Sequence, residues 1–154
     1  MKEDVKPARL RFFHRPDDPW SHLLLQVLPR LARAYEVEIQ CVTVPFPDIE
    51  HAPRPELLAR HALRDASDLA RYVDVEFESD GRLPDQASVT LASRALLALD
   101  TTGQYLAAAH PIGRALFAGD SQALESLCGS IELPDEPAAA LMLQGNYESL
   151  LEAG

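Results

Sequence analysis

The strand-helix-strand pattern of residues 8–44 limits the fold of this chain more than any other feature of its sequence. Residues 8–14, ARLRFFH, are mostly apolar and stop before Arg15-Pro16, which predicts a short β-strand. Between residues 20 and 35 apolar side chains recur every three or four positions, as in a helix that packs on a sheet. Residues 36–44, EVEIQCVTV, predict a second strand. We therefore expect a right-handed βαβ unit with parallel strands.

From residue 55 onward the sequence predicts helices only. A loop with four prolines, residues 45–55, leaves the second strand. Apolar side chains at helical spacing then predict helices over residues 55–73, 86–103, 104–120, 121–131 and 138–154. We expect Pro29 to kink the first helix, and Pro111 with Gly113 to break or bend the helix over 104–120. The predicted fold class is α/β, with a βαβ half over 8–50 and a helical domain over 55–154.

Composition restricts the partners of this chain. Its 154 residues are 47% hydrophobic, enough for the core of one domain, or of one domain with an insertion. Fourteen Lys and Arg against 24 Asp and Glu give a formal charge of −10, which repels nucleic acids and anionic membrane surfaces. No apolar run has the length of a signal peptide or a membrane span. We expect a cytoplasmic protein with neither nucleic acid nor membrane as its partner.

The cysteines and histidines lack the spacing of redox or metal motifs. Cys41 and Cys128 form no CxxC pair, and we interpret them as two buried thiols. A dithiol redox enzyme would require these two cysteines to meet in the fold. The five histidines lie apart without a ligand motif, so no metal site is predicted.

The sequence DDPWSH, residues 17–22, forms the turn between the first strand and its helix. Asp is a preferred N-cap residue, and Pro19 suits the first position of a helix. The pattern therefore predicts a capping role for Asp18, which Asp17 could share. A helix N-terminus also carries unpaired N–H groups and the positive end of the helix dipole, and these stabilise an anion. The residues alone leave open whether Asp18 only caps the helix or also contacts a ligand.

The segment FFHRPDDPWSHLLLQVLPRLARAYEVEIQCVTVPF resembles the opening of the DsbA-like branch of the thioredoxin superfamily. That branch includes 2-hydroxychromene-2-carboxylate isomerases and kappa-class glutathione transferases. Its members have two aromatic residues at the end of a strand, a four-residue active motif that opens a helix, a second strand and an inserted helical domain. Here the motif is Asp18-Pro19-Trp20-Ser21. The resemblance implies a thioredoxin-like βαβ core with an inserted all-helical domain.

This chain differs from the family pattern at two places. DsbA-like oxidoreductases have Cys at both ends of the motif, whereas this chain has Asp18 and Ser21, which excludes dithiol exchange at this site. The isomerases and transferases have Ser in place of Asp18, and a carboxylate there repels a glutathione thiolate. Nothing after Pro137 matches the final strands and helix of the family. We expect the C-terminal part of that fold to be missing here, with a homodimer partner or the missing segment covering the sheet edge.

The resemblance implies an isomerase- or glutathione-transferase-like enzyme that binds a small organic or thiol ligand at the helix N-terminus, with glutathione as its cofactor. The candidate catalytic residues are Asp18 and Ser21, and the candidate ligand-binding residues are Trp20, His14 and His22. First-turn N–H groups would stabilise an anion, and Asp18 or a nearby histidine would transfer a proton. The alternative is a non-catalytic thioredoxin-fold module that serves in binding or assembly.

Overall fold

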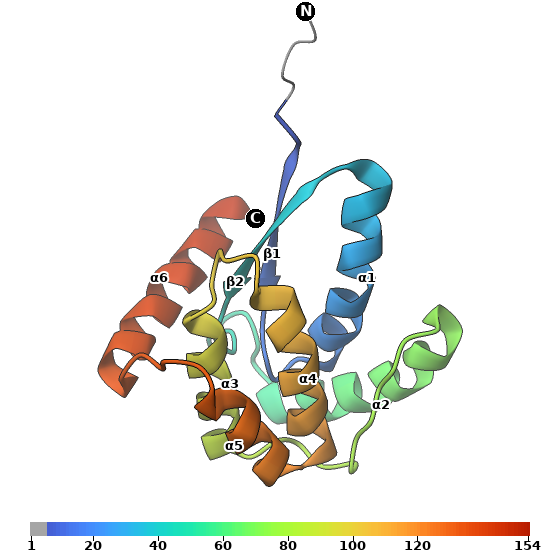
Figure 1. The fold of residues 1–154 in the computed structure, drawn as a ribbon. Coiled ribbons are helices and arrows are strands. Elements are labelled where there is room, and N and C mark those ends of the chain that lie inside the picture. The colour runs from blue at the N-terminus through green and yellow to red at the C-terminus, as the bar shows by residue number, and fades with distance from the viewer. Residues whose placement is uncertain (1–5) are drawn as a thin grey trace, which may run out of the picture.

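The computed structural model of the protein describes residues 6–154 (Figure 1). Two strands and the helix between them come first, and five further helices follow. In chain order the elements are β1 (Arg9–His14), α1 (Pro19–Tyr35), β2 (Glu38–Thr43), α2 (Pro55–Val73), α3 (Gln86–Leu97), α4 (Tyr105–Ala118), α5 (Ser121–Gly129) and α6 (Glu136–Ala153). Among the described residues, no helix combines the length and the apolar composition needed to cross a membrane.

The predicted βαβ start is confirmed. β1 and β2 pair in parallel, with Arg9 opposite Glu38 and His14 opposite Thr43, and α1 connects them. The described residues form a sheet of these two strands. The fold is therefore α/β at its start and helical over the greater part of the chain.

α1 begins where the turn sequence predicts, with Asp18 as N-cap and Pro19 in the first turn. It continues through Pro29 and ends at Glu36, whose left-handed backbone, with φ of 51°, lets its N–H bond to the Ala32 carbonyl. Leu25 and Leu28 are buried against Phe12 of β1 and Cys41 of β2. This contact fixes α1 on one face of the sheet.

One core connects the sheet to the later helices. Phe12 and Cys41 share it with side chains of α3, α4 and α5, among them Leu96, Ile112 and Leu124. Figure 1 shows α3, α4 and α5 gathered below the sheet, with α2 crossing beside α1 and α6 along the opposite side. A smaller cluster, Leu23 with Ala66 and Ala70, holds α2 against α1.

Two helix predictions are corrected. The helix expected over 86–103 ends at Leu97, because Asp100 and Thr101 turn toward β2 and bond to its backbone. The helix expected to break or bend near Pro111 does not break there, since α4 runs without interruption from Tyr105 to Ala118. Pro111 removes the hydrogen bond to Ala107, a residue exposed to water that can hydrate that carbonyl.

Candidate functional site

The turn before α1 is a well-formed helix cap. The Asp18 carboxylate accepts hydrogen bonds from the Ser21 N–H at 2.9 Å and from the Ser21 hydroxyl at 2.7 Å, both at Oδ2. Asp18 has an extended backbone, as N-cap residues do. The two candidate catalytic residues are therefore bonded to each other in the cap.

Arg15 holds both aspartates of the turn. Its Nε lies 3.0 Å from Asp17 Oδ1 and its Nη2 lies 3.6 Å from Asp18 Oδ1. The Nε atom has no hydrogen-bond partner among the described residues, so its contact with Asp17 is an ion pair without a directed hydrogen bond. The guanidinium also lies over the Phe46 ring, 4.3 Å from its centroid. This arrangement joins the turn before α1 to the loop after β2.

Asp17 differs from Asp18 in its surroundings. Burial raises the pKa of Asp17, and the neighbouring Asp18 adds to the rise, while the Arg15 guanidinium opposes it. Asp17 therefore takes up a proton at a higher pH than an exposed aspartate does. A carboxyl group of this kind is suited to exchanging a proton with a ligand.

A cavity of about 320 Å³ lies against Asp17. The turn, the loop after β2, α3 and α6 enclose it. Its apolar walls include Val44, Phe46, Val89 and Leu143. Its polar groups include Asp17, Thr90, Arg94 and Glu136. It thus lies at the carboxyl ends of the two parallel strands, which is where open α/β sheets bind ligands. A volume of this size accommodates a small organic molecule.

Arg94 supplies the cavity with positive charge. Its Nε donates to the Pro134 carbonyl at 2.8 Å, which fixes the side chain. No carboxylate of the described chain forms an ion pair with it. The two Nη groups of Arg94 can therefore receive a ligand carboxylate.

The other sequence-predicted residues point elsewhere. The Trp20 indole donates to Asp65 Oδ2 at 2.7 Å and packs edge-on against His61, so it faces α2. His14 and His22 are both buried. None of Asp18, Ser21, Trp20, His14 and His22 lines the cavity beside Asp17.

The His14 side chain is hydrogen-bonded within a buried polar network. The Thr43 hydroxyl donates to Asp100 Oδ1 at 2.6 Å, and Asn146 Nδ2 donates to Asp100 Oδ2 at 2.7 Å. Because the Thr43 hydroxyl uses its proton in the bond to Asp100, its oxygen accepts from the Tyr105 hydroxyl at 2.9 Å. Tyr105 then accepts from His14 Nδ1–H, also at 2.9 Å. This chain of bonds fixes the histidine and leaves its Nδ1 unavailable as a base.

His22 lies in an aromatic pocket between α1 and α4. Its ring contacts those of Phe77, His110 and Phe117, at centroid distances of 5.4 to 6.1 Å. Burial lowers the pKa of His22 to about 4, and His110 contributes. Burial lowers the pKa of His14 to about 3, with a smaller effect of His22. Both imidazoles are therefore neutral at physiological pH.

Both cysteines are free and buried. Burial raises the pKa of Cys41 to about 12, and it raises that of Cys128 as well. Such thiols are poor nucleophiles. In the described part of the chain, no cluster of three or more His, Cys, Asp and Glu side chains has the arrangement of a metal site.

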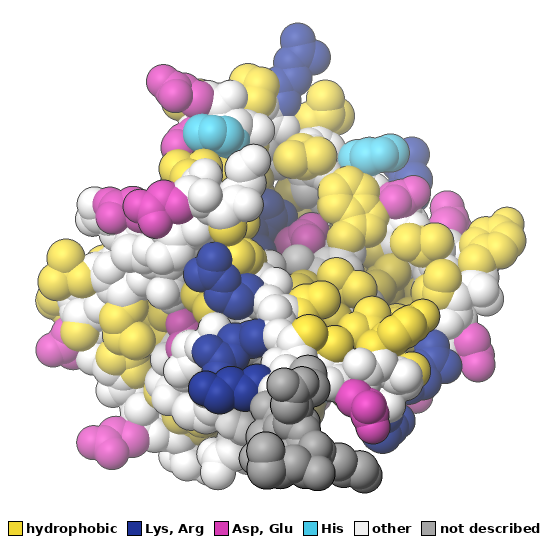
Figure 2. Space-filling view, turned by 90° about the horizontal axis from the view of Figure 1, so that it is seen from above, with side chains coloured by type: hydrophobic (Ala, Val, Ile, Leu, Met, Phe, Trp, Pro, Cys, Tyr) yellow, Lys and Arg dark blue, Asp and Glu magenta, His cyan; other side chains and the backbone are white. Residues whose placement is uncertain are grey.

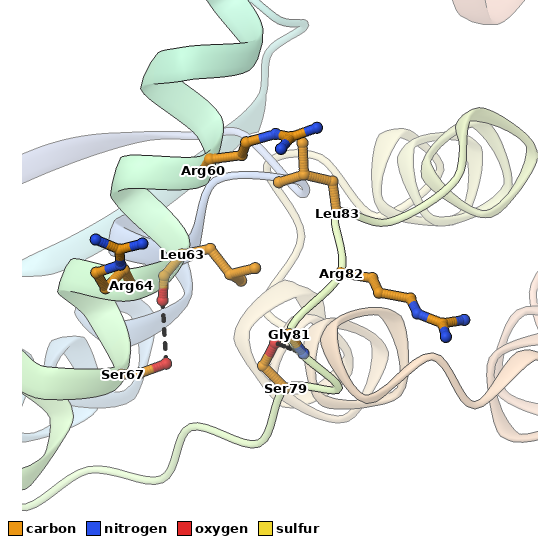
Figure 3. A pocket seen from close by; sticks show the side chains of 8 residues that line it. All are labelled: Arg60, Leu63, Arg64, Ser67, Ser79, Gly81, Arg82 and Leu83. Atoms are coloured by element: carbon orange, nitrogen blue, oxygen red, sulfur yellow. Dashed lines mark hydrogen bonds between the residues drawn. The ribbon is translucent and has the colours of Figure 1, made fainter.

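A second hollow, of about 640 Å³, lies between α2 and the loop 79–83 (Figure 3). Three arginines line it: Arg60, Arg64 and Arg82. Figure 3 shows Arg64 and Arg82 pointing away from each other on opposite sides, so their charges do not converge. The cavity beside Asp17 is the better candidate, because it combines apolar walls with a few polar groups at the carboxyl ends of the two strands.

No family model matches the chain, and comparisons with curated proteins and with solved structures also find no match.

The cap itself gives a first prediction. We expect Asp18→Ala to lower the free energy of unfolding by about 1 kcal/mol, because two first-turn hydrogen bonds lose their acceptor. Urea unfolding measures this loss. Asp85 caps α3 through the N–H and the hydroxyl of Ser88 and provides the matched control, so Asp85→Ala should cost a similar amount. A loss of ligand binding in Asp18→Ala alone would show a role for Asp18 beyond the cap.

Proposed function

We propose that this protein binds a small organic ligand in the cavity beside Asp17. The supporting observation is the position of this cavity, which lies at the carboxyl ends of β1 and β2 and has apolar walls and a partly buried carboxyl group. A ligand with an apolar body and a carboxylate fits these groups, since Arg94 lines the cavity and has no ion-pair partner among the described residues.

We further propose a DsbA-like thioredoxin fold for the chain, with the isomerase and glutathione-transferase side of that family as the functional class. Glutathione carries two carboxylates and a thiol, and Arg94 suits one of those carboxylates. In this proposal Asp17, rather than Asp18, exchanges a proton with the ligand, because Asp18 is bonded to Ser21 while Asp17 faces the cavity.

The second candidate function is a non-catalytic binding or assembly module. One observation favours it: both candidate catalytic residues, Asp18 and Ser21, are engaged in the helix cap. In such a module the turn serves stability only, and glutathione has no site.

Filling the cavity tests the ligand proposal. Ala140 lies on α6 at the cavity wall, and its exposed position allows a larger side chain. We expect isothermal titration of the parent with glutathione to give saturable heat, and Ala140→Trp to abolish it by occupying the space. Ala34→Trp, at an exposed position of α1, is the control and should bind as the parent does.

Two results contradict the proposal in different ways. No heat from the parent at up to about 5 mM glutathione excludes glutathione as the ligand and favours the module. Equal binding by the parent and Ala140→Trp places the ligand outside this cavity.

A further inference from the structure

The backbone hydrogen bonds of the sheet show which residues face its two outer edges. The Glu38 N–H donates to the Ala8 carbonyl, and the Val44 N–H donates to the His14 carbonyl. In a parallel ladder of this register, the even-numbered residues of β1 bond to β2. The backbone groups of Arg9, Arg11 and Phe13 therefore face the outer edge of β1.

The outer edge of β2 is closed by other parts of the chain. The Cys41 carbonyl accepts from the Thr101 N–H at 3.0 Å. The Thr43 N–H donates to Asp100 Oδ1 at 2.9 Å, and the Thr43 carbonyl accepts from Asn146 Nδ2 at 2.7 Å. These bonds leave little of that edge for another strand.

The outer edge of β1 remains open. Within residues 6–154, the backbone groups of Arg9, Arg11 and Phe13 bond to no other backbone group. Arg9 and Arg11 are exposed, and Phe13 is half-buried. A strand edge of this kind is a template for pairing with another extended segment.

The side chains of β1 make this edge positively charged. Arg9 and Arg11 lie on the same face of the sheet, and Lys6 lies exposed just before the strand. Arg9 already has a partner in β2, since its Nε lies 3.3 Å from Glu38 Oε2 at the exposed start of the sheet. Arg11 stacks over Phe13 at 5.3 Å, and no carboxylate of the described chain forms an ion pair with it. Figure 2, seen from the end of the molecule where β1 begins, shows Lys and Arg side chains gathered beside a hydrophobic stretch.

These charges disfavour a second copy on the edge. Antiparallel pairing of two β1 strands brings the Arg9 and Arg11 side chains of both copies together, and like charges across a strand pair are destabilising. Each copy also carries a formal charge of −10. An acidic strand avoids the first of these obstacles, because its carboxylates lie beside the arginines of β1.

We propose that the outer edge of β1 binds an extended segment of a partner protein in which acidic and apolar residues alternate. The partner's backbone pairs with Arg9, Arg11 and Phe13, as in recognition by strand addition. Its acidic side chains lie beside Arg9 and Arg11. Its apolar side chains lie on the opposite face, beside Leu10, which is 39% exposed.

A synthetic peptide tests this proposal. The probe is a fluorescein-labelled peptide of about eight residues that alternates Glu and Val, and fluorescence anisotropy reports its binding. We expect saturable binding to the parent protein and roughly tenfold weaker binding to Arg11→Glu. A peptide that alternates Lys and Val should not bind, because its charges repel those of the edge.

Backbone pairing is tested by Arg11→Pro. Proline removes an N–H that faces outward, so β1 and β2 remain paired while the edge loses a donor. We expect this variant to keep its circular dichroism spectrum and to lose the peptide. Arg33→Glu, at an exposed position of α1, is the charge control and should bind normally.

Three results would overturn the proposal. The first is equal binding of the Glu and Lys peptides. The second is unchanged binding by a folded Arg11→Pro variant. The third is a dimer of the parent, seen by analytical ultracentrifugation, that Arg11→Pro dissociates, since a second copy would then be the occupant.

Discussion

Acid should destabilise this protein steeply below pH 6.5, because two buried histidines must take up protons when it unfolds. Burial lowers the folded-state pKa of His14 to about 3 and that of His22 to about 4, whereas both have the ordinary value of 6.5 when unfolded. The stability that they contribute is fully present above pH 6.5 and is lost as the pH falls from there toward 4. Between these values the two histidines together lower the free energy of unfolding by about 2.7 kcal/mol per pH unit.

Urea unfolding at several pH values between 7.5 and 4.5 measures this dependence. His22→Leu removes one of the two groups and should reduce the histidine contribution to about 1.4 kcal/mol per pH unit. The raised pKa values of Asp17 and Asp100 act in the opposite direction, so the informative quantity is the difference in slope between the parent and His22→Leu. His61→Gln, at an exposed position, is the control. Equal slopes for the parent and His22→Leu would contradict the prediction.

Gly113→Ala should be strongly destabilising, although alanine is the better helix former. A Cβ atom at this position of α4 would lie 2.4 Å from His22 Nδ1 and 2.8 Å from its Cε1. The buried His22 ring has little room to move away. Overpacking of this kind costs about 1 to 3 kcal/mol or more, and the gain in helix propensity, about 1 kcal/mol, offsets part of it. We expect a cost near the upper end of this range, so the free energy of unfolding should fall by about 2 kcal/mol in total.

The same substitution elsewhere provides the control. Gly145 lies in α6 with open space around it, so Gly145→Ala should raise the free energy of unfolding by about 1 kcal/mol. A double-mutant cycle with His22→Ala tests the cause: in that background Gly113→Ala should no longer destabilise the protein. If the cost of Gly113→Ala persists there, contact with His22 is not its origin.

The first third of the fold could be predicted because local chemistry specifies it. The apolar patterns of residues 8–44 and the Asp18-Pro19 cap each depend on near neighbours in the sequence, and the strands, α1 and their parallel pairing agree with those patterns. The helix starts at Pro55 and Gln86 also agree with the prediction.

Features that depend on contacts between distant residues could not be predicted in this way. The sequence predicts that Gly113, with Pro111, breaks or bends the helix, whereas Gly113 provides space for His22 from another helix. The early end of α3 follows from the bonds of Asp100 and Thr101 to β2, which no local pattern reveals.

The residues of the candidate site also depend on contacts between distant parts of the chain. The sequence indicated the turn, but the choice of Asp17 over Asp18 at the cavity depends on the positions of α3 and α6. Phe46 could have been found from the sequence, because it follows the second of two parallel strands, where ligands of such sheets bind. Arg94 could not, since the sequence does not distinguish it from the other arginines on helices.

The closure of the β2 edge has a consequence for how the chain folds. Thr43 bonds to Asp100, 57 residues away, and to Asn146, 103 residues away. Contacts of such separation form late, because long loops must close first. During synthesis both edges of the nascent βαβ segment would stay open until Asp100 and Thr101 have left the ribosome, and the Thr43 carbonyl would wait for Asn146.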